Sequence, residues 1–117
     1  MIVDDEHFVS TMLAEYLGDL GCVTYVAHNG EEAIRLFNEK KDEIDIVILD
    51  INMPIMDGIR FIQEVKETSF RFVPILVLST ETERTLKDQA KAAGAAGWLV
   101  KPFRPEQLLW VVKKFIR

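Results

Sequence analysis

The chain has 117 residues, of which 14 are Lys or Arg and 19 are Asp or Glu, so its formal net charge is −5. This length suits a single domain of roughly 100–200 residues. Hydrophobic residues make up 49% and charged residues 28% of the chain, which excludes a disordered protein. The acidic balance gives no electrostatic basis for binding nucleic acid or an anionic membrane. We therefore expect one soluble globular domain, 1–117, with neither nucleic acid nor membrane as a partner.

The sequence shows no sign of secretion, membrane insertion or disulfide bonding. Residues 1–6 lack the basic and apolar regions of a signal peptide. The apolar runs at 73–78 and 108–112 are far shorter than the roughly 18 residues that a membrane span needs. The single cysteine, Cys22, cannot form an internal disulfide, so we interpret it as a small packed hydrophobic residue. A reducing compartment fits best, and we expect a cytoplasmic location.

Short apolar runs alternate with helical patterns along the chain. The first half predicts an apolar stub at 1–3, a helix over 6–20, a strand over 22–27, a helix over 31–40 and a strand over 45–50. The second half predicts a helix over 59–67, a strand over 75–79, a helix over 82–93, a strand over 98–100 and a helix over 105–116. Right-handed crossovers between five parallel strands predict a three-layer α/β/α domain. The last helix ends almost at the C-terminus, so we expect no attached output domain.

Polar side chains gather where the predicted strands end. Asp4 and Asp5 follow the first strand, Asp50 ends the third, Ser79 ends the fourth and Lys101 follows the fifth. Because ligands bind at the carboxyl edge of a parallel sheet, we expect these five side chains to share one site. Each of them alone also has an ordinary interpretation, such as a helix N-cap or a solvated lysine.

The charges of this cluster indicate its chemistry. Clustered carboxylates repel one another, and a hard divalent cation such as Mg²⁺ relieves the repulsion through oxygen ligands. An aspartate can also attack phosphorus and form an acyl phosphate. Lys101 would supply a cation and Ser79 a hydroxyl donor to the transferred group. Asp50 ends the central buried strand, so we predict that it is the attacked residue.

Four segments of the sequence resemble the response-regulator receiver family, and most of all its CheY-type chemotaxis regulators. They are residues 3–6 (VDDE), 49–54 (LDINMP) with 56–58 (MDG), 78–81 (LSTE) and 97–103 (GWLVKPF). The resemblance implies a flavodoxin-like, CheY-like α/β fold whose five parallel strands have the order 2-1-3-4-5. It also implies a phosphorylation-activated signalling switch of a two-component system.

The resemblance further implies how phosphate and metal would be held. Asp50 would be the phosphoacceptor. Asp5 would bind Mg²⁺ directly and Asp4 mainly through water, with Asp50 and the backbone carbonyl of Asn52 as further ligands. Lys101 would contact the phosphoryl group and would be joined to Pro102 by a cis peptide bond.

Regulatory roles are implied for four residues. Ser79 and Trp98 occupy the family's switch positions, although tyrosine or phenylalanine is commoner at the second. Asn52 and Glu81 would flank the route of the attacking water and tune the rate of dephosphorylation. The domain would be no conventional enzyme, yet it would catalyse its own phosphorylation and autodephosphorylation.

The implied partners are a sensor histidine kinase as phosphodonor and a downstream protein such as a flagellar motor switch or a phosphotransfer protein. A homodimer could form through the fourth helix, fifth strand and fifth helix, or through the first strand. Trp98 and Trp110 are candidates for the partner surface. Trp110 points away from the apolar arc of the last helix, either as an interaction hot spot or lying flat on a lysine stem.

Alternative functions stay open. The chain could be a phosphorelay intermediate or an isolated receiver fragment of a larger response regulator. A Mg²⁺-dependent phosphatase of the haloacid-dehalogenase type is less well supported, since Asn52 stands where its second aspartate would be. Only three residues precede Asp4, fewer than the family usually has. We therefore expect an upstream start, a truncated chain or a first strand supplied by another chain.

Overall fold

The computed structural model describes residues 1–4, 7–19, 21, 23–50, 58–68, 72–80, 84–101 and 103–115. The predictions made for Asp5, Cys22, Asn52, Glu81 and Pro102 lie outside these described residues.

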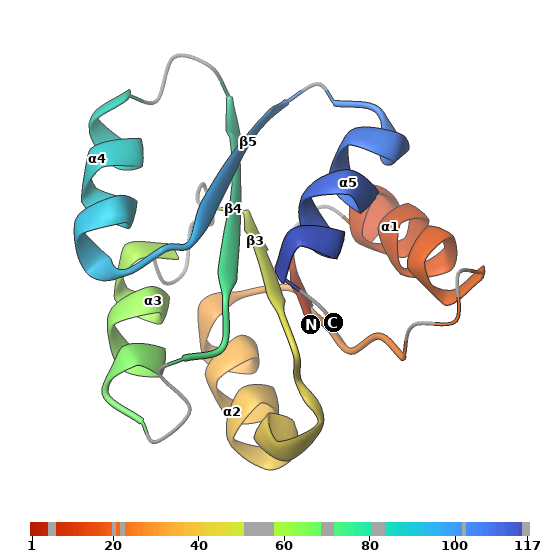
Figure 1. The fold of residues 1–117 in the computed structure, drawn as a ribbon. Helices are drawn as coiled ribbons and strands as arrows, with labels where there is room; N and C mark the ends of the chain where they lie inside the picture. Colours follow the sequence, from red (N-terminus) through yellow and green to blue (C-terminus); the bar gives the residue numbers. More distant parts are fainter. Residues whose placement is uncertain are drawn as a thin grey trace.

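Five parallel strands form one sheet in the order β2-β1-β3-β4-β5 (Figure 1). The strands are β1 (Ile2–Val3), β2 (Val26–Ala27), β3 (Val47–Asp50), β4 (Ile75–Thr80) and β5 (Gly97–Lys101). The predicted strand order and the short first strand are both confirmed. The central β3 is buried along its whole length, as its continuous apolar run indicates.

Helices cover both faces of the sheet and complete the predicted three layers (Figure 1). They are α1 (His7–Asp19), α2 (Gly30–Lys40), α3 (Gly58–Lys66), α4 (Arg84–Ala93) and α5 (Pro105–Phe115), and a short 3₁₀ turn, η1 (Lys41–Glu43), follows α2. The helices α1 and α5 pack on one face, and α2, α3 and α4 pack on the other. Within the described residues, no helix has both the length and the apolar character that crossing a bilayer requires.

Strand alternation divides the core into two hydrophobic clusters. Successive side chains of a strand point to opposite faces. On the α1/α5 face lie Ile2, Leu13, Leu17, Ile46, Ile48, Leu76, Leu78, Leu108 and Val112. On the α2/α3/α4 face the cluster includes Val3, Ala27, Ala33, Phe37, Val47, Leu49, Phe61, Ile62, Val65, Ile75, Val77 and Ala90. Residues two positions apart in a strand point to the same face. The cluster that contains one strand residue therefore shows to which face the residue two positions later points.

Two helices begin with recognisable caps. The Asn29 side chain accepts a hydrogen bond from the Glu32 amide (2.8 Å), and the Glu32 carboxylate accepts one from the His28 amide (3.4 Å). At the start of α5, the Arg104 amide donates to the Gln107 side chain (2.8 Å). These bonds satisfy amides that the first helical turn cannot pair internally, and so they fix where α2 and α5 begin.

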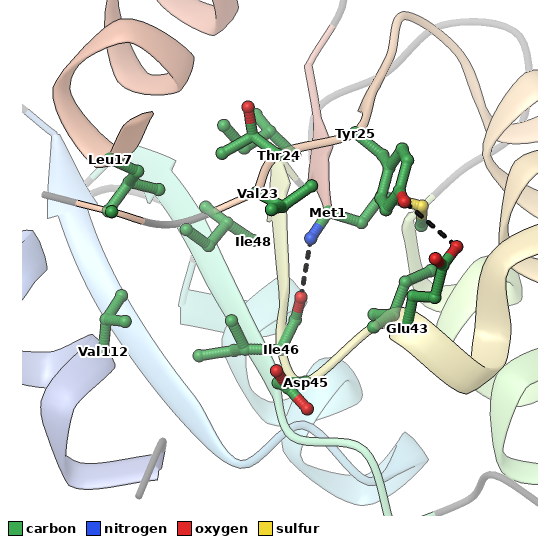
Figure 2. A pocket seen from close by; sticks show the side chains of 13 residues that line it. Met1, Leu17, Val23, Thr24, Tyr25, Glu43, Asp45, Ile46, Ile48 and Val112 are labelled. Carbon is green, nitrogen blue, oxygen red and sulfur yellow. Dashed lines mark hydrogen bonds between the residues drawn. The ribbon is translucent and has the colours of Figure 1, made fainter. Parts of the chain in front are cut away.

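Two strands begin later than the sequence predicts. The expected strand over 22–27 is a strand only at Val26–Ala27, and the one expected over 45–50 begins at Val47. The cause is the length of β1, which has only two residues to pair with its neighbours on either side. Residues 23–25 and 44–46 have strand-like composition, but β1 begins too late to extend its hydrogen bonding back beyond the carbonyls of Tyr25 and Ile46 (Figure 2).

Candidate functional site

Two aspartates lie side by side at the carboxyl edge of the sheet. Val3 of β1 pairs with Leu49 of β3, so the following residues, Asp4 and Asp50, stand at the same level of neighbouring strands. Both residues are buried. Ile2 and Ile48, two positions earlier, belong to the α1/α5 cluster, so alternation directs both aspartates to one face.

Lys101 reaches this pair from the far side of β4. Its Nζ lies 3.2 Å from Asp50 Oδ2, and the side chains are 23% and 4% exposed respectively. The two strands are separated by β4, a distance of roughly 10 Å at a spacing of ~4.8 Å per strand. The four-carbon stem of lysine spans that gap. Leu99 packs against the α1/α5 cluster, so Lys101 continues the face to which Asp50 points.

Ser79 is fully buried and belongs to the other face of the sheet. Asp50 pairs with Leu78, and Ser79 follows Leu78 directly. Val77 pairs with Trp98, and both pack with the α2/α3/α4 cluster. Alternation therefore puts Ser79 on the same side as Trp98, one step along β4 from the level of Asp50. Ser79 thus lies on β4, the strand between that of Asp50 and that of Trp98, two residues beyond the level of Trp98.

The donors at this edge suit a hard cation. Asp4 and Asp50 offer carboxylate oxygens at one level, and Mg²⁺ is typically held by one or two carboxylates together with phosphate and water oxygens. No group of three His, Cys, Asp or Glu side chains that could hold a metal occurs within the described ranges. Asp5 and Asn52, the other predicted ligands, lie outside these ranges. The two described carboxylates fit a partly hydrated Mg²⁺.

Trp110 points away from the core, as predicted. Its side chain is 63% exposed, whereas Leu108 and Val112 on the same helix are buried. The ammonium of Lys114 lies 3.7 Å from the centre of the tryptophan ring. This cation–π contact corresponds to one of the two predicted interpretations, in which the Trp110 ring lies against a neighbouring lysine. An exposed ring remains available as a contact surface, so both interpretations of Trp110 stand.

The comparison with protein families decides the assignment. A family model described as the response regulator receiver domain matches residues 1–113. The chain belongs to the response-regulator receiver family. Receiver domains of this family act in two-component systems, where they interact with sensor histidine kinases and downstream effectors and generally bind Mg²⁺ at the phosphorylation site.

Known relatives of this receiver domain fall into two groups. The chemotaxis protein CheY4 of Vibrio cholerae is 40% identical with a TM-score of 0.91, covering 98% of this chain and 95% of that one. The probable transcriptional regulator ycf29 of Porphyra purpurea is 35% identical over 99% of this chain but only 55% of its own length. The regulatory protein AtoC of Escherichia coli is 32% identical over 100% of this chain and 25% of its own length. The receiver domain thus spans about half the length, or less, of these curated relatives.

Sequence reasoning missed a polar contact at the opposite edge of the sheet. The Tyr25 hydroxyl donates a hydrogen bond to Glu43 Oε2 at 3.0 Å. This bond, together with desolvation and the nearby charge of Glu43, raises the pKa of Tyr25 above its usual 10.0. The two residues belong to different predicted elements and share no motif, so no sequence signal joins them.

Proposed function

We propose that Asp50 accepts a phosphoryl group from the phosphohistidine of a sensor histidine kinase, with the help of Mg²⁺. We further propose that the chain then signals through a protein–protein contact. The observation that supports this best is the 3.2 Å ion pair between Asp50 and Lys101, beside the neighbouring carboxylate of Asp4. Two anions and one cation at a strand-end edge can surround a phosphoryl group and a divalent ion.

The transfer step uses one carboxylate oxygen of Asp50 as the nucleophile. That oxygen forms a bond to phosphorus as the phosphorus–nitrogen bond of the phosphohistidine breaks, and the imidazole nitrogen retains the electron pair. Lys101 holds the Asp50 carboxylate in place and offers its ammonium to the phosphoryl oxygens. The buried Ser79 hydroxyl would donate to another of these oxygens.

Mg²⁺ would be bound by Asp4 and Asp50, with Asp5 and the Asn52 carbonyl completing the proposed set. When bound, it neutralises the charge that accumulates on the phosphoryl oxygens. A cation would also reduce the repulsion between Asp4 and Asp50, which stand at one level. We assign the nucleophile to Asp50 and the holding of the cation to Asp4, because the sequence motif at 49–54 and the 3.2 Å contact to Lys101 belong to Asp50.

Phosphotransfer from a panel of autophosphorylated histidine kinases tests this assignment. We expect Mg²⁺-dependent labelling of the intact chain and none of Asp50→Asn. Asp45→Asn is a matched control, since Asp45 is an exposed aspartate near the other end of the same strand. Persistent labelling of Asp50→Asn, or labelling without Mg²⁺, would refute the proposal.

We propose that Ser79 and Trp98 transmit phosphorylation to the partner surface. They share one face of the sheet, and Trp98 packs against the α2/α3/α4 cluster while remaining partly exposed. Phosphorylated Asp50 would draw the Ser79 hydroxyl toward it, and Trp98 would follow into the vacated space. Tryptophan emission after adding Mg²⁺ and beryllofluoride, in a Trp110→Phe background, should change. An unchanged spectrum with unchanged partner affinity contradicts the switch.

We propose chemotaxis as the output, because CheY4 of Vibrio cholerae matches almost end to end. The competing output, a receiver within a longer transcriptional regulator, is favoured by the greater length of the curated relatives. A third possibility is a phosphorelay intermediate. Affinity of the beryllofluoride-activated chain for a flagellar motor switch protein and for a histidine phosphotransfer protein discriminates among them. Tight binding to neither supports the longer regulator.

Two further roles remain proposals. Asn52 and Glu81 are proposed to set the phosphate lifetime, and substituting both should change that lifetime if they do. Trp110 is proposed to contribute to a target or homodimer surface formed by α4, β5 and α5. Trp110→Ala should then weaken that association, and unchanged affinity would leave only its packing against Lys114.

A further inference from the structure

The outer side of α5 presents a large aromatic side chain to water. Leu108 and Val112 of this helix are buried in the α1/α5 cluster, whereas Trp110 is 63% exposed. Trp110 stands two positions from each of them, which is about 160° around the helix. Because α5 packs with α1 on one face of the sheet (Figure 1), the Trp110 ring faces away from the sheet.

Two lysines share this side of the helix. Lys113 and Lys114 follow Trp110 by three and four positions, the spacing at which helical side chains are neighbours, and both are exposed. Cations in the last turn of a helix offset the negative end of its dipole, which accounts for the two lysines. That effect needs no indole beside them. The exposed ring among cations therefore requires a separate explanation.

The contact between Lys114 and Trp110 organises this surface before a partner arrives. Lys114 Nζ lies 3.7 Å from the centre of the Trp110 ring. Covering a freely rotating side chain costs rotamer entropy, and a ring that a neighbour already restrains loses less. An ammonium has three N–H donors, so Lys114 can contact the ring and a carboxylate at the same time.

The charges on α5 select the kind of partner. Along the helix sequence, Glu106 is the one acidic residue, and it lies a full turn before Trp110. Beside the ring, a basic partner would meet two like charges and an acidic partner two opposite charges. The chain as a whole carries a net charge of −5, so this side of α5 differs in charge from the average surface.

We propose that the outer side of α5 docks an acidic protein segment of the downstream partner. An apolar side chain of that segment covers the Trp110 ring, and flanking carboxylates pair with Lys113 and Lys114. The proposal rests on the partner role assigned to Trp110 above and adds the chemistry of that partner. Trp98 packs with the α2/α3/α4 cluster on the other face of the sheet, so docking on α5 does not depend on the state of Asp50.

Amide chemical shifts measured during titration with the peptide acetyl-Asp-Glu-Leu-Leu-Asp-Glu-amide test the proposal. We expect saturable shifts centred on residues 107–114. Acetyl-Asp-Glu-Ser-Ser-Asp-Glu-amide should bind at least about tenfold more weakly, because the apolar contact with the ring is lost. Acetyl-Lys-Lys-Leu-Leu-Lys-Lys-amide should not bind saturably, since its charges are repelled. Raising sodium chloride to about 0.5 M should weaken binding of the acidic peptide severalfold.

Substitutions of exposed side chains keep the test independent of folding. Trp110→Ala should weaken binding about 30-fold, the loss typical of an aromatic hot spot, and Trp110→Phe should stay within about threefold of the parent chain. Lys113→Ala should weaken it about twofold to fivefold, because one exposed ion pair is lost. Lys91→Ala, which removes an exposed lysine from the last turn of α4, is the matched control and should have no effect. Asp50→Asn should bind like the parent chain, so docking and phosphotransfer can fail separately.

Four results would overturn the proposal. The first is the absence of saturable shifts, or equal binding of the basic peptide. The second is unchanged affinity of Trp110→Ala. The third is a set of shifts centred on Lys91, Ala95 and Trp98, which would place the acidic segment between α4 and β5. The fourth is Trp110-dependent self-association, or co-sedimentation with phosphatidylglycerol vesicles, without shifts from the acidic peptide. The occupant would then be a second copy or a lipid surface.

Discussion

Removing the lysine of the candidate site should cost far more stability than neutralising its aspartate. Lys101→Met removes the cation that lies 3.2 Å from Asp50, whose buried carboxylate stands at one level with that of Asp4. Asp50→Asn leaves Lys101 without its anion, but the lysine is 23% exposed and can be solvated. The same change removes the repulsion between the two aspartates. The two substitutions break one ion pair and yet should differ sharply.

The geometry sets the magnitudes. At 3.2 Å and an effective dielectric constant of ~20, the attraction between Lys101 and Asp50 is about 5 kcal/mol before desolvation is subtracted. Leaving a buried charge uncompensated costs about 3–5 kcal/mol. We expect Lys101→Met to lower the free energy of unfolding by about 3 kcal/mol, near the lower end of this range, because water reaches part of the ion pair. Asp50→Asn should cost about 1 kcal/mol or less.

Urea unfolding followed by far-ultraviolet circular dichroism measures both changes. The double substitution completes a thermodynamic cycle, in which we expect a coupling energy of about 2 kcal/mol. Lys113→Met, which removes an exposed lysine of α5, is the matched control and should stay within about 0.5 kcal/mol of the parent chain. Added Mg²⁺ should stabilise Lys101→Met more than the parent chain. A cost for Asp50→Asn equal to or above that of Lys101→Met would refute the electrostatic reasoning.

Three further substitutions probe the rest of the fold. Gly94 has a φ of +117°, and a Cβ there would lie 2.9 Å from the Lys66 side chain, so Gly94→Ala should lower the free energy of unfolding by about 1–3 kcal/mol in urea titration. The pKa of Tyr25 is raised above 10.0 in the folded chain, so the stability from its bond to Glu43 is complete below pH 10 and is lost as pH rises through the folded value. Thermal midpoints of Tyr25→Phe should therefore fall less steeply above pH 10 than those of the parent chain. Phe37 is fully buried, and Phe37→Ala should cost about 3–5 kcal/mol in urea unfolding, whereas a cost below 1 kcal/mol would show that the core collapses around the gap.

The sequence alone determined the architecture and the edge of the sheet that carries the candidate site. Apolar runs alternating with helical periods require parallel strands joined by helices, and parallel strands bring their carboxyl ends to one edge. That single rule is enough to place Asp4, Asp50, Ser79 and Lys101 at one end of the sheet. The strand order came from the family resemblance, because local patterns do not specify which strands are neighbours.

Only the tertiary structure decided how these side chains meet. Asp50 and Lys101 are 51 residues apart in the chain, and their contact depends on the register of two strands against β4. The same sheet geometry places Ser79 on the face that carries Trp98, and not on the face to which Asp50 points. Strand lengths also depend on tertiary structure. Residues 23–25 have strand-like composition, but the bonds from β1 to this segment extend back only as far as the Tyr25 carbonyl among the described residues. The Tyr25–Glu43 contact likewise joins side chains 18 residues apart, so it has no local signal in the sequence.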